Sequence, residues 1–375
     1  YKMKKELLII TTSELTINSF LLPLINKLKK KIKITVISNF YSRSYNQLKK
    51  QGITVYNLNI NRKIKIISDL KILIQINKII KKNKFKLIYT ITPKAGLLGM
   101  FSGYINDVPQ RIHIFTGQVW VNKFFIFKIF LKILDKLIFY FSTDILCDGL
   151  NQKKYLNQNG FVKPITVINN GSICGINTSI FKPSKKAKLL FRKKFNIKDN
   201  EKVFLYTGRM SSEKGIKNLL NTFFLLRKKN FMVHFFFVGL DEDGFFDKKT
   251  KNIEGIHYFE HTKNIDEFYK FSDIFITSSY REGFGISVAQ AMSSKLPIIG
   301  PSIYGLKDLL INNLNSYTFK VGNDEELYRC CLKLIKNNDA VVRLGLNGRK
   351  MIKKKYEEKK VISEYYNFLI GKLIV

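Results

Sequence analysis

The most informative stretch of this sequence reads VFLYTGRMSSEKG and occupies residues 203–215. Its first five residues are largely apolar, which is typical of a buried parallel strand, and the glycine that follows allows a sharp turn. In open α/β sheets, ligands bind beyond the carboxyl ends of the strands, near helix starts. Arg209 and Lys214 would project there, and two cations beside a helix start suit a diphosphate. A surface turn with two solvated cations is the alternative for this stretch alone.

A second stretch, SSYREGFGISVAQAM at residues 278–292, repeats this arrangement. It follows the expected strand Ile274–Thr277 and leads through a glycine-containing turn into a helix. The first backbone N–H groups of such a helix form an anion-binding nest. Glu282 on the loop and Gln290 on the helix would both reach a ligand over the strand ends. A routine loop with an exposed glutamate is the alternative.

Short apolar runs alternate with helical patterns along the chain, which predicts βαβ units and parallel sheets. The expected strands are Leu7–Thr11, Ile32–Ser38, Ile53–Leu58, Leu87–Ile91, Arg111–Phe115, Asp144–Cys147, Ile165–Ile168, Val203–Thr207, Met232–Val238, Ile256–Phe259, Ile274–Thr277 and Pro297–Ile299. Helical patterns include Ile17–Lys30, Ile64–Lys82 and the tail from Asp324 onward. We therefore expect one domain over residues 1–182, a second over 183–355 and a terminal helix over 356–375.

Composition supports two globular domains, because 375 residues exceed the size at which single cores stop growing, about 250–300 residues. A hydrophobic content of 45% excludes a disordered or collagen-like chain. The unusual feature is charge, since 65 Lys and Arg against 28 Asp and Glu give a formal net charge of +37. This excess favours an anionic partner: nucleic acid, anionic lipid or a phosphorylated ligand. Compositional drift toward Lys, Asn, Ile, Phe and Tyr is an equally good explanation for much of it.

Cysteine usage and apolar segments limit the cellular context. The four cysteines have no metal-binding spacing, so reduced thiols in a cytoplasmic protein are expected. The apolar run over residues 7–10 is too short for a signal peptide, and no stretch offers the ~18 uncharged apolar residues of a transmembrane helix. Any membrane contact is therefore expected to be peripheral.

The first half of the chain contains a segment suited to a membrane surface. Residues 124–140 are strongly apolar and carry Lys128, Lys132 and Lys136, which a helix would place on one side. An interfacial helix that meets lipid phosphates and a core helix with a solvated lysine stripe both fit this pattern. The lysine-rich segment 60–86 adds a second basic surface, and residues 1–184 hold 30 Lys and Arg against 7 Asp and Glu.

Taken together, GRMSSEKG at residues 208–215 and EGFGISVAQAM at residues 282–292 resemble the retaining glycosyltransferase family 4. Similar stretches at 273–276, 295–300, 303–308, 115–120 and 170–172 look like bacterial members that build surface polysaccharides and lipid-linked glycans. The resemblance implies an α/β GT-B fold: two Rossmann-like domains with parallel sheets facing across a cleft, and C-terminal helices packing back toward the N-terminal domain. It also implies a nucleotide sugar as donor, with a UDP-sugar favoured. The implied acceptor is a polyprenyl-diphosphate-linked saccharide at an anionic membrane surface, the cytoplasmic face of the inner membrane.

The resemblance assigns roles to residues of the second half. The implied donor-binding residues are Gly208, Arg209, Lys214, Glu282, Gly283, Phe284, Gly285, Ile286 and Gln290. Arg209 and Lys214 would hold the diphosphate and Glu282 the sugar, and these three are the expected catalytic residues. The sequence departs from the family at Gln290, where a second acid normally binds the ribose. An amide still accepts one hydrogen bond and donates another, so a weakened ribose contact is expected. No metal or other cofactor is implied.

On the acceptor side the resemblance is less specific. The candidate residues are Thr12, Ser13, His113, Thr116, Gly117 and Gln118. Many relatives have a histidine directly before the glycine of a turn near the transferred sugar, but this chain has Thr116 there. His113 lies three residues upstream on an expected strand, where a structural, hydrogen-bonded role is the alternative.

Three further interpretations remain open. Asp241, Glu242 and Asp243 match the DxD pattern that binds a metal diphosphate in the other large glycosyltransferase fold, although a solvated acidic loop is the simpler interpretation. A GT-B sugar-nucleotide epimerase would share the fold and act without an acceptor. A basic nucleic-acid-binding protein would explain the charge, but the sequence has no recognisable reader motif, so nucleic acid is not expected as a partner.

Overall fold

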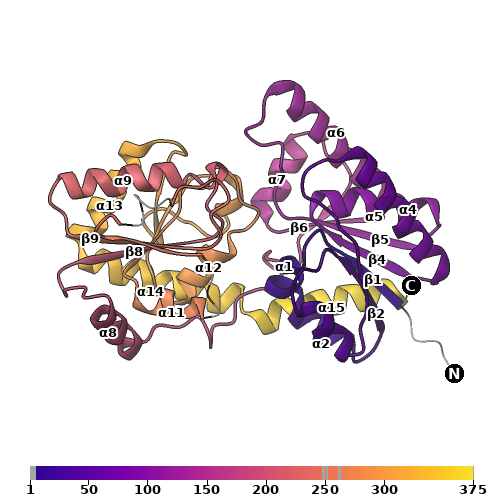
Figure 1. Ribbon diagram of the computed structural model, residues 1–375, viewed down its shortest axis with the longest axis horizontal. Coiled ribbons are helices and arrows are strands. Elements are labelled where there is room, and N and C mark those ends of the chain that lie inside the picture. Colours follow the sequence, from indigo (N-terminus) through magenta and orange to yellow (C-terminus); the bar gives the residue numbers. More distant parts are fainter. Residues whose placement is uncertain (1–5, 247–249, 251, 261, 263, 375) are drawn as a thin grey trace. The chain divides into compact units, whose positions relative to one another are not determined.

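The computed structural model describes residues 6–246, 250, 252–260, 262 and 264–374. The chain forms two compact units (Figure 1). The first unit comprises Tyr1–Cys174 together with Lys359–Val375, and the second comprises Gly175–Glu358. Each unit is a parallel sheet with helices on both faces.

The sheet of the first unit has seven strands in the order β3-β2-β1-β4-β5-β6-β7. All of the paired strands run parallel. A strand that is buried on both faces needs a continuous apolar run, which is why the strands read as Val- and Ile-rich segments. The strands are β1 (Glu6–Ile10), β2 (Lys33–Ser38), β3 (Thr54–Asn57), β4 (Leu87–Ile91), β5 (Gln110–Phe115), β6 (Asp144–Cys147) and β7 (Ile165–Thr166).

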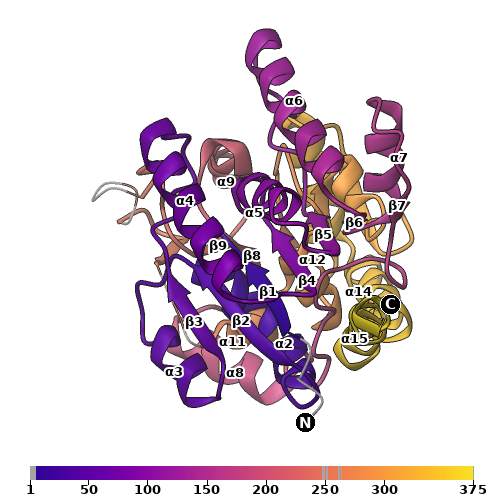
Figure 2. The same ribbon diagram turned by 90° about the vertical axis from the view of Figure 1, so that its right-hand side faces the viewer.

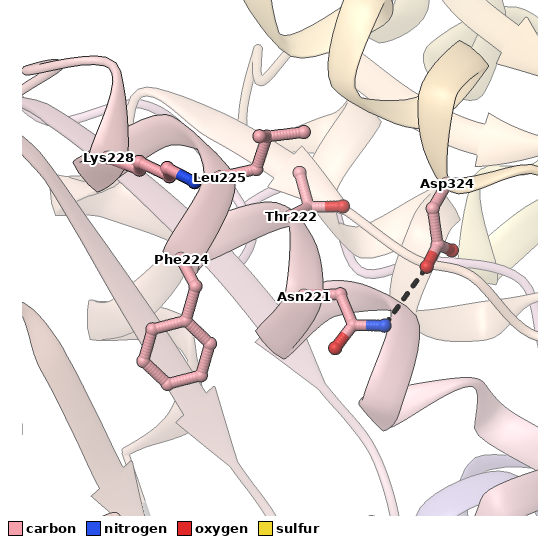
Figure 3. Close-up of a pocket in the computed structure, with 6 residues that line it drawn as sticks. All are labelled: Asn221, Thr222, Phe224, Leu225, Lys228 and Asp324. Carbon is pink, nitrogen blue, oxygen red and sulfur yellow. Dashed lines mark hydrogen bonds between the residues drawn. The ribbon is translucent and has the colours of Figure 1, made fainter.

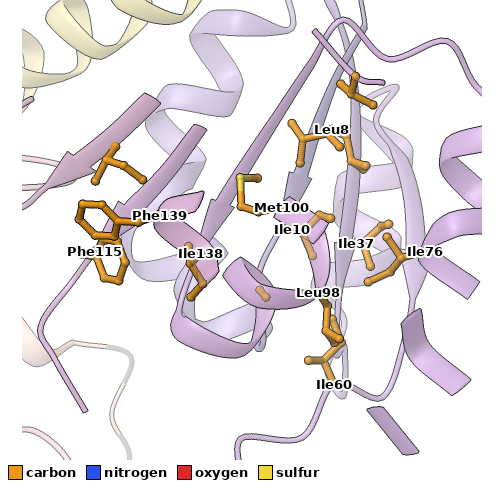
Figure 4. Close-up of a cluster of buried hydrophobic side chains, with 14 of the residues drawn as sticks. Leu8, Ile10, Ile37, Ile60, Ile76, Leu98, Met100, Phe115, Ile138 and Phe139 are labelled. Atoms are coloured by element: carbon orange, nitrogen blue, oxygen red, sulfur yellow. The ribbon is translucent and has the colours of Figure 1, made fainter. Parts of the chain in front are cut away.

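Helices cover both faces of this sheet (Figures 1 and 2). They are α1 (Glu14–Thr16), α2 (Leu22–Leu28), α3 (Ser44–Lys50), α4 (Ile66–Lys82), α5 (Pro93–Ile105), α6 (Phe125–Phe141), α7 (Leu150–Gln158) and α15 (Glu358–Ile374), with the π-helical η1 (Ile17–Leu21) between α1 and α2. Figure 4 shows part of the core of this unit, in which Ile37 lies beside Ile76 and Phe115 lies beside Phe139. On the other face lie α2 and α15.

The sheet of the second unit has six strands in the order β10-β9-β8-β11-β12-β13. The strands are β8 (Lys202–Thr207), β9 (Val233–Val238), β10 (Ile256–Phe259), β11 (Ile274–Ile276), β12 (Ile298–Pro301) and β13 (Ser316–Phe319). Alternation along β9 builds two cores, since Phe235 and Phe237 join one cluster while Phe236 joins the other. The sequence analysis did not predict β13, which is short and partly polar.

The helices of the second unit divide between the two cores. They are α8 (Lys185–Lys194), α9 (Ile216–Lys228), α11 (Ile265–Phe271), α12 (Ile286–Ser293), α13 (Asp324–Lys336) and α14 (Asn338–Lys355), with the short 3-10 turns η2 (Ser212–Lys214) and η3 (Tyr304–Leu306). Helices α9 and α13 cover one face of the sheet, and α11, α12 and α14 cover the other (Figure 1).

The borders between the units differ from the expected 182/183 and 355/356. The backbone N–H of Ile176 donates to Tyr356 O at 2.7 Å, and Glu358 N donates to Ile176 O at 3.0 Å. These bonds tie residues 175–182 to the end of α14, so this segment belongs to the second unit. The terminal helix α15 belongs to the first unit, where Lys372 pairs with Asp144 at 2.5 Å. No helix among the described residues is long and apolar enough to span a bilayer.

Candidate active site

Two loops at the carboxyl edge of the second sheet are locked together. One follows β8 and holds Gly208–Gly215, and the other follows β11 and holds Thr277–Gly285. Ser278 Oγ donates to Gly215 O at 2.6 Å. Gly215 has a φ of +68°, and a Cβ there would lie 2.4 Å from Ser278 O, so only glycine fits this contact. The two expected ligand loops are therefore packed tightly against each other.

The Lys214 and Glu282 side chains meet at this junction. Lys214 Nζ lies 2.6 Å from Glu282 Oε1, and both side chains are about four-fifths buried, at 18% and 19% exposure. Burial raises the pKa of Glu282, but the charge of Lys214 and hydrogen bonds from Lys214 and Ser279 outweigh it, so that the pKa lies below its ordinary value. Glu282 is thus ionised at neutral pH and holds Lys214 in a fixed position.

Arg209 is held by a different acid. Its guanidinium pairs with Glu242, which lies after β9, and its backbone carbonyl accepts a hydrogen bond from Tyr206 Oη at 2.8 Å. The side chains of Arg209 and Glu242 are exposed by 38% and 29%. The backbone approach that permits this pair needs glycine, because a Cβ on Gly239 would lie 2.0 Å from Gly208 O. A second pair, Arg281 with Glu213 at 2.9 Å, closes the other side of the loops.

The start of helix α12 completes this edge. Gly285 has a φ of +84° and caps the helix, and Ile286 is its first residue. Gly305 of η3 packs directly beneath the loop, since a Cβ there would lie 2.0 Å from Glu282 O. Phe284 points away from the loop surface into the core, 5.0 Å from the ring of Tyr356. The first N–H groups of α12 therefore lie beside Gly283 and Glu282. These N–H groups have no hydrogen-bond acceptor within the helix, so they are available to a ligand.

Gln290 lies one turn further along α12 and is part of a buried hydroxyl chain. Tyr269 Oη donates to Gln290 Oε1 at 3.0 Å and lies 2.5 Å from Thr207 Oγ1. Burial strongly raises the pKa of Tyr269, so its hydroxyl stays protonated. The amide oxygen of Gln290 accepts the hydrogen bond from Tyr269. The amide nitrogen of Gln290 takes no part in this contact.

The three carboxylates of the acidic loop after β9 are each engaged within the protein. Asp241 accepts backbone N–H groups of Gly244, Phe245 and Phe246 at 2.8–3.1 Å. Glu242 pairs with Arg209, and Asp243 accepts both the N–H and the hydroxyl of Ser212 at 2.7 Å. These bonds to Ser212 lower the pKa of Asp243. Among the described residues, no three His, Cys, Asp or Glu side chains converge as a metal site would require.

The acceptor-side candidates lie in the first unit, at the carboxyl edge of its sheet. Thr12 is buried and its hydroxyl bonds to that of Thr92, whereas Ser13 caps α1 by accepting from Leu15 N at 3.3 Å. Thr116 is half-buried, and Gly117 turns the chain with a φ of +104°. Ser13 and Thr116 are therefore the candidates with partly exposed side chains.

The other two candidates, His113 and Gln118, are corrected by their burial. His113 lies inside the first unit, where Nδ1 is 2.7 Å from Thr90 Oγ1 and a Cβ on Gly96 would lie 2.4 Å from the ring. Burial lowers the pKa of His113 to about 3, so the ring is neutral. Gln118 is also fully buried. Neither side chain is at the surface of this structure, and the contact of His113 with Thr90 fits the structural alternative.

A surface pocket exists in the second unit but lies outside these loops. Figure 3 shows its lining, which comes from the second half of α9 and the first residue of α13. Asn221 Nδ2 donates to Asp324 Oδ2 at 3.1 Å across its base, and Phe224 and Leu225 form its apolar wall. No residue of the two ligand loops contributes to this pocket.

Several residues that hold these loops through long-range contacts carry no signal in the sequence. Glu242 was considered only for a metal, Glu213 and Arg281 were not singled out, and Tyr269 lies on a helix with no recognisable signal. Their partners are 33, 68 and 21 residues away in the sequence. Sequence spacing carries no information on such pairs, so only the fold identifies them.

Comparison with known proteins agrees with this geometry. Residues 188–351 match the family model described as "Glycosyl transferases group 1", and residues 7–148 match "Glycosyl transferase 4-like". The capsular polysaccharide biosynthesis glycosyltransferase CapM of Staphylococcus aureus is 27% identical over 316 residues, which cover 81% of each chain. An Escherichia coli enzyme named UDP-Gal:alpha-D-GlcNAc-diphosphoundecaprenol alpha-1,3-galactosyltransferase is 24% identical over 301 residues, covering 78% of this chain and 76% of that one.

Solved structures agree on the fold. HepE of Anabaena, crystallised with UDP and glucose, superposes with a TM-score of 0.80 at 16% identity and covers 98% of this chain and 100% of its own. The two parallel-sheet Rossmann-like units are therefore those of a GT-B glycosyltransferase. With a glycosyl transferase 4-like domain followed by a glycosyl transferases group 1 domain, this chain belongs to the glycosyltransferases, related to bacterial enzymes of capsule and lipid-linked glycan synthesis.

Proposed function

We propose that this glycosyltransferase moves a sugar from a nucleotide sugar, with a UDP-sugar favoured, to a lipid-linked saccharide in bacterial surface-glycan synthesis. The observation that carries the proposal is the buried Lys214–Glu282 pair between two loops at the carboxyl edge of the second sheet. The name of the E. coli relative specifies a UDP-sugar donor and a diphosphoundecaprenol-linked acceptor, and HepE was crystallised with UDP. Both support the same substrate classes for this chain.

The diphosphate of the donor would bind between Arg209 and Lys214. Arg209 now pairs with Glu242 at a partly exposed site, and a bidentate phosphate is the stronger partner for a guanidinium. Lys214 would contact the phosphate next to the sugar while Glu282 keeps the ammonium in place. The N–H groups at the start of α12, around Gly285, would add a partial positive charge.

The reaction that this arrangement supports retains the anomeric configuration. The bond between the anomeric carbon and the diphosphate oxygen breaks, and its electron pair passes to the leaving phosphate. Arg209, Lys214 and the α12 start would stabilise the developing charge. The acceptor oxygen bonds to the anomeric carbon on the same face, and its proton passes to the leaving phosphate oxygen. Because the two cations supply the charge stabilisation, no metal is required in this scheme.

On the acceptor side, Ser13 and Thr116 are the proposed contacts. Both lie after strands of the first sheet, at the edge where ligands bind in open α/β folds, and both have partly exposed side chains. Their hydroxyls would orient the saccharide by hydrogen bonds rather than by charge. Thr12 would act only through its bond to Thr92.

The test is UDP release from a panel of UDP-sugars with a lipid-linked acceptor, in the presence and absence of EDTA, with the product anomer assigned by NMR. We expect acceptor-dependent release that EDTA does not abolish, and a retained anomer. Arg209→Ala should lower kcat/KM by ~10²-fold or more, whereas Arg329→Ala, an exposed arginine paired within α13, should leave it unchanged. Equal turnover in Arg209→Ala would contradict the site, and conversion of free UDP-sugar without acceptor would indicate an epimerase instead.

A further inference from the structure

Helix α6 of the first unit presents an apolar stripe to solvent. Five apolar residues of α6 recur at intervals of three or four, so they lie along one side of the helix. They are Ile126, Phe130, Ile133, Leu137 and Tyr140, and each is at least 38% exposed. The residues around the helix start are the most exposed, with Phe124 at 91%, Phe125 at 77% and Ile126 at 82%.

The lysines of α6 do not form the solvated stripe that was one of the two interpretations of this segment. Lys132 is half-buried: its Nζ lies 5.5 Å from the ring centroid of Trp120 and 3.4 Å from Asn159 Oδ1. Lys128 is also half-buried, whereas Lys136 is exposed. The most exposed surface of this helix is therefore apolar, with lysines along its flank.

Helix α4 and the residues before it repeat this pattern. Ile66 and Ile67 are 73% and 75% exposed, and Leu70 and Ile74 continue the exposed side into the next turns. Ile64, just before the helix, is exposed as well. Helices α4, α5 and α6 pack side by side on one face of the first sheet (Figure 2).

The exposed starts of α4 and α6 lie at the same edge of the sheet. Helix α4 follows β3 and α6 follows β5, and in a parallel sheet all strands end at one edge. Lys94, in the first turn of α5, donates to Lys63 O and pairs with Asp69 at 2.8 Å. It is two residues from Thr92, which bonds to Thr12. These contacts place the start of α4 next to the acceptor-side loop, which is the loop after β1 that holds Thr12 and Ser13.

The charge around these residues has one sign. Between residues 61 and 82, and between 122 and 141, the only acidic residues are Asp69 and Asp135. Asp69 is paired with Lys94, and Asp135 is buried and accepts from Trp120 Nε1 at 2.8 Å. Lys63 and Lys65 are exposed beside the isoleucines. An apolar surface bordered only by cations is complementary to a bilayer with anionic headgroups.

From these observations we infer that Ile64, Ile66, Ile67, Phe124, Phe125 and Ile126, here called the apolar rim, insert into the interface of an anionic bilayer. The flanking lysines contact the lipid phosphates. The rim borders the carboxyl edge of the first sheet, so docking holds Ser13 and Thr116 at headgroup depth. The lysines at the far end of α4, Lys78, Lys81 and Lys82, lie toward the other edge of the sheet and do not take part.

A second copy of the chain is the competing occupant of the rim. A two-fold contact would place each rim against an identical surface. It would bring the lysines of both copies together with no exposed acid on either helix to pair with them. Like charges at that distance repel, so the observations favour lipid.

This inference rests on the proposed function, because the rim explains how an acceptor anchored in lipid reaches the acceptor-side loop. The diphosphate of such an acceptor lies at headgroup depth, the level at which the rim would hold the first sheet. A water-soluble acceptor analogue would not need the rim.

The experiment is co-sedimentation of the full chain with vesicles of phosphatidylglycerol and phosphatidylcholine, and with phosphatidylcholine alone. The rim variant carries Ile66→Ser, Ile67→Ser, Phe125→Ser and Ile126→Ser, all at exposed positions. The matched control carries Val342→Ser and Leu346→Ser, exposed apolar residues of α14 in the second unit. We expect the wild type and the control to bind anionic vesicles. The affinity of the rim variant for these vesicles should be at least about tenfold lower. Lys63→Ser with Lys65→Ser should weaken binding, and Lys81→Ser with Lys82→Ser should not.

Four results of the vesicle and oligomer measurements would overturn the inference, and a fifth comes from turnover. The first two are vesicle binding by the rim variant that equals that of the wild type, and wild-type binding to neutral vesicles that equals its binding to anionic vesicles. The third is a loss of binding in the control that equals the loss in the rim variant. The fourth is a wild type that forms a dimer and binds no vesicles, together with a rim variant that is a monomer. The binding assay does not depend on turnover. Vesicle binding without sugar transfer would therefore contradict the proposed function, while the inference about the rim would still hold. Transfer to the lipid-linked acceptor at the wild-type rate by the rim variant would contradict the inference alone.

Discussion

Each of the two sheets has a buried carboxylate beyond its strand ends, and the structure holds these carboxylates in opposite ionisation states. In the second unit, Glu282 pairs with Lys214, and that cation keeps the pKa of the carboxyl below its ordinary value despite burial. In the first unit, Asp148 follows β6 directly, and burial raises its pKa to about 8. Asp148 Oδ1 makes no hydrogen bond within the described part of the chain.

Under the proposed function, this difference would let one architecture serve two kinds of ligand. The second edge carries fixed charge, with Arg209 and Lys214 each held by an acid, and so it is prepared for an anion. The first edge carries hydroxyls and a neutral carboxyl, which would suit the uncharged saccharide of the proposed acceptor. Lysines also flank the exposed apolar residues at the starts of α4 and α6, which is where the inferred lipid surface would be met.

The largest effect is expected from removing the cation of the second edge. Lys214→Ala takes away a charge aimed at the leaving diphosphate and leaves Glu282 buried without its cation, so kcat should fall by about 10²–10³-fold. Steady-state UDP release measures this. Lys217→Ala, an exposed lysine three residues later on α9, is the matched control. A loss of less than tenfold would mean that the second edge is not specialised for the anion.

The neutral carboxyl of the first edge predicts an unusual pH dependence of stability. Between about pH 4 and pH 8 the unfolded chain loses the Asp148 proton while the folded chain keeps it. The free energy of unfolding should therefore fall with rising pH by up to ~1.4 kcal/mol per pH unit, a slope that Asp148→Asn removes. Chemical denaturation at pH 5, 6 and 7 measures both slopes.

Chemical denaturation of Glu282→Gln at the same pH values tests whether the carboxylates of the two sheet edges differ in ionisation. The pKa of Glu282 is lowered, so its contribution to stability is present above its unfolded pKa and is lost only as the pH falls through the folded value. Between pH 6 and 7 it is almost fully ionised in both states, so Glu282→Gln should leave the slope there nearly unchanged. Parallel curves for wild type and Asp148→Asn would show that Asp148 is ionised in the folded protein.

The sequence predicted what depends on local pattern and missed what depends on distant partners. The apolar run VHFFFV of β9 and the glycine turns at Gly208 and Gly285 follow from backbone rules, and each of the twelve expected strands overlaps a strand of the structure, whereas β13 was missed. The unit border depends on Ile176 bonding to a strand-like segment 180 residues later, which no local signal announces. The burial of His113 likewise depends on Gly96 of a neighbouring helix.

A smaller effect is expected at the glycine that locks the ligand loops. Gly215 and Gly52 both have positive φ, at +68° and +78°, but a Cβ on Gly215 meets Ser278 O whereas Gly52 has open space. Gly52→Ala should cost about 1 kcal/mol of unfolding free energy through backbone strain alone. Gly215→Ala should cost ~2 kcal/mol or more, with a matching loss of activity, because the loop after β11 must also move. Equal costs in denaturant unfolding would show that the two loops are not locked.

The smallest effect is expected at Tyr269, which reaches the second edge only through Gln290. Tyr269→Phe removes the hydroxyl that joins Thr207 to the amide oxygen of Gln290, a net hydrogen-bond contribution of ~1 kcal/mol. The KM for the nucleotide sugar should therefore rise about fivefold while kcat changes little. A double-mutant cycle with Gln290→Ala separates positioning from packing, because residues that act as a unit are not additive. If Tyr269 positions the amide, Tyr269→Phe should leave KM unchanged in the Gln290→Ala background. Additive effects would mean that the tyrosine supports the fold of the edge and not its ligand contact.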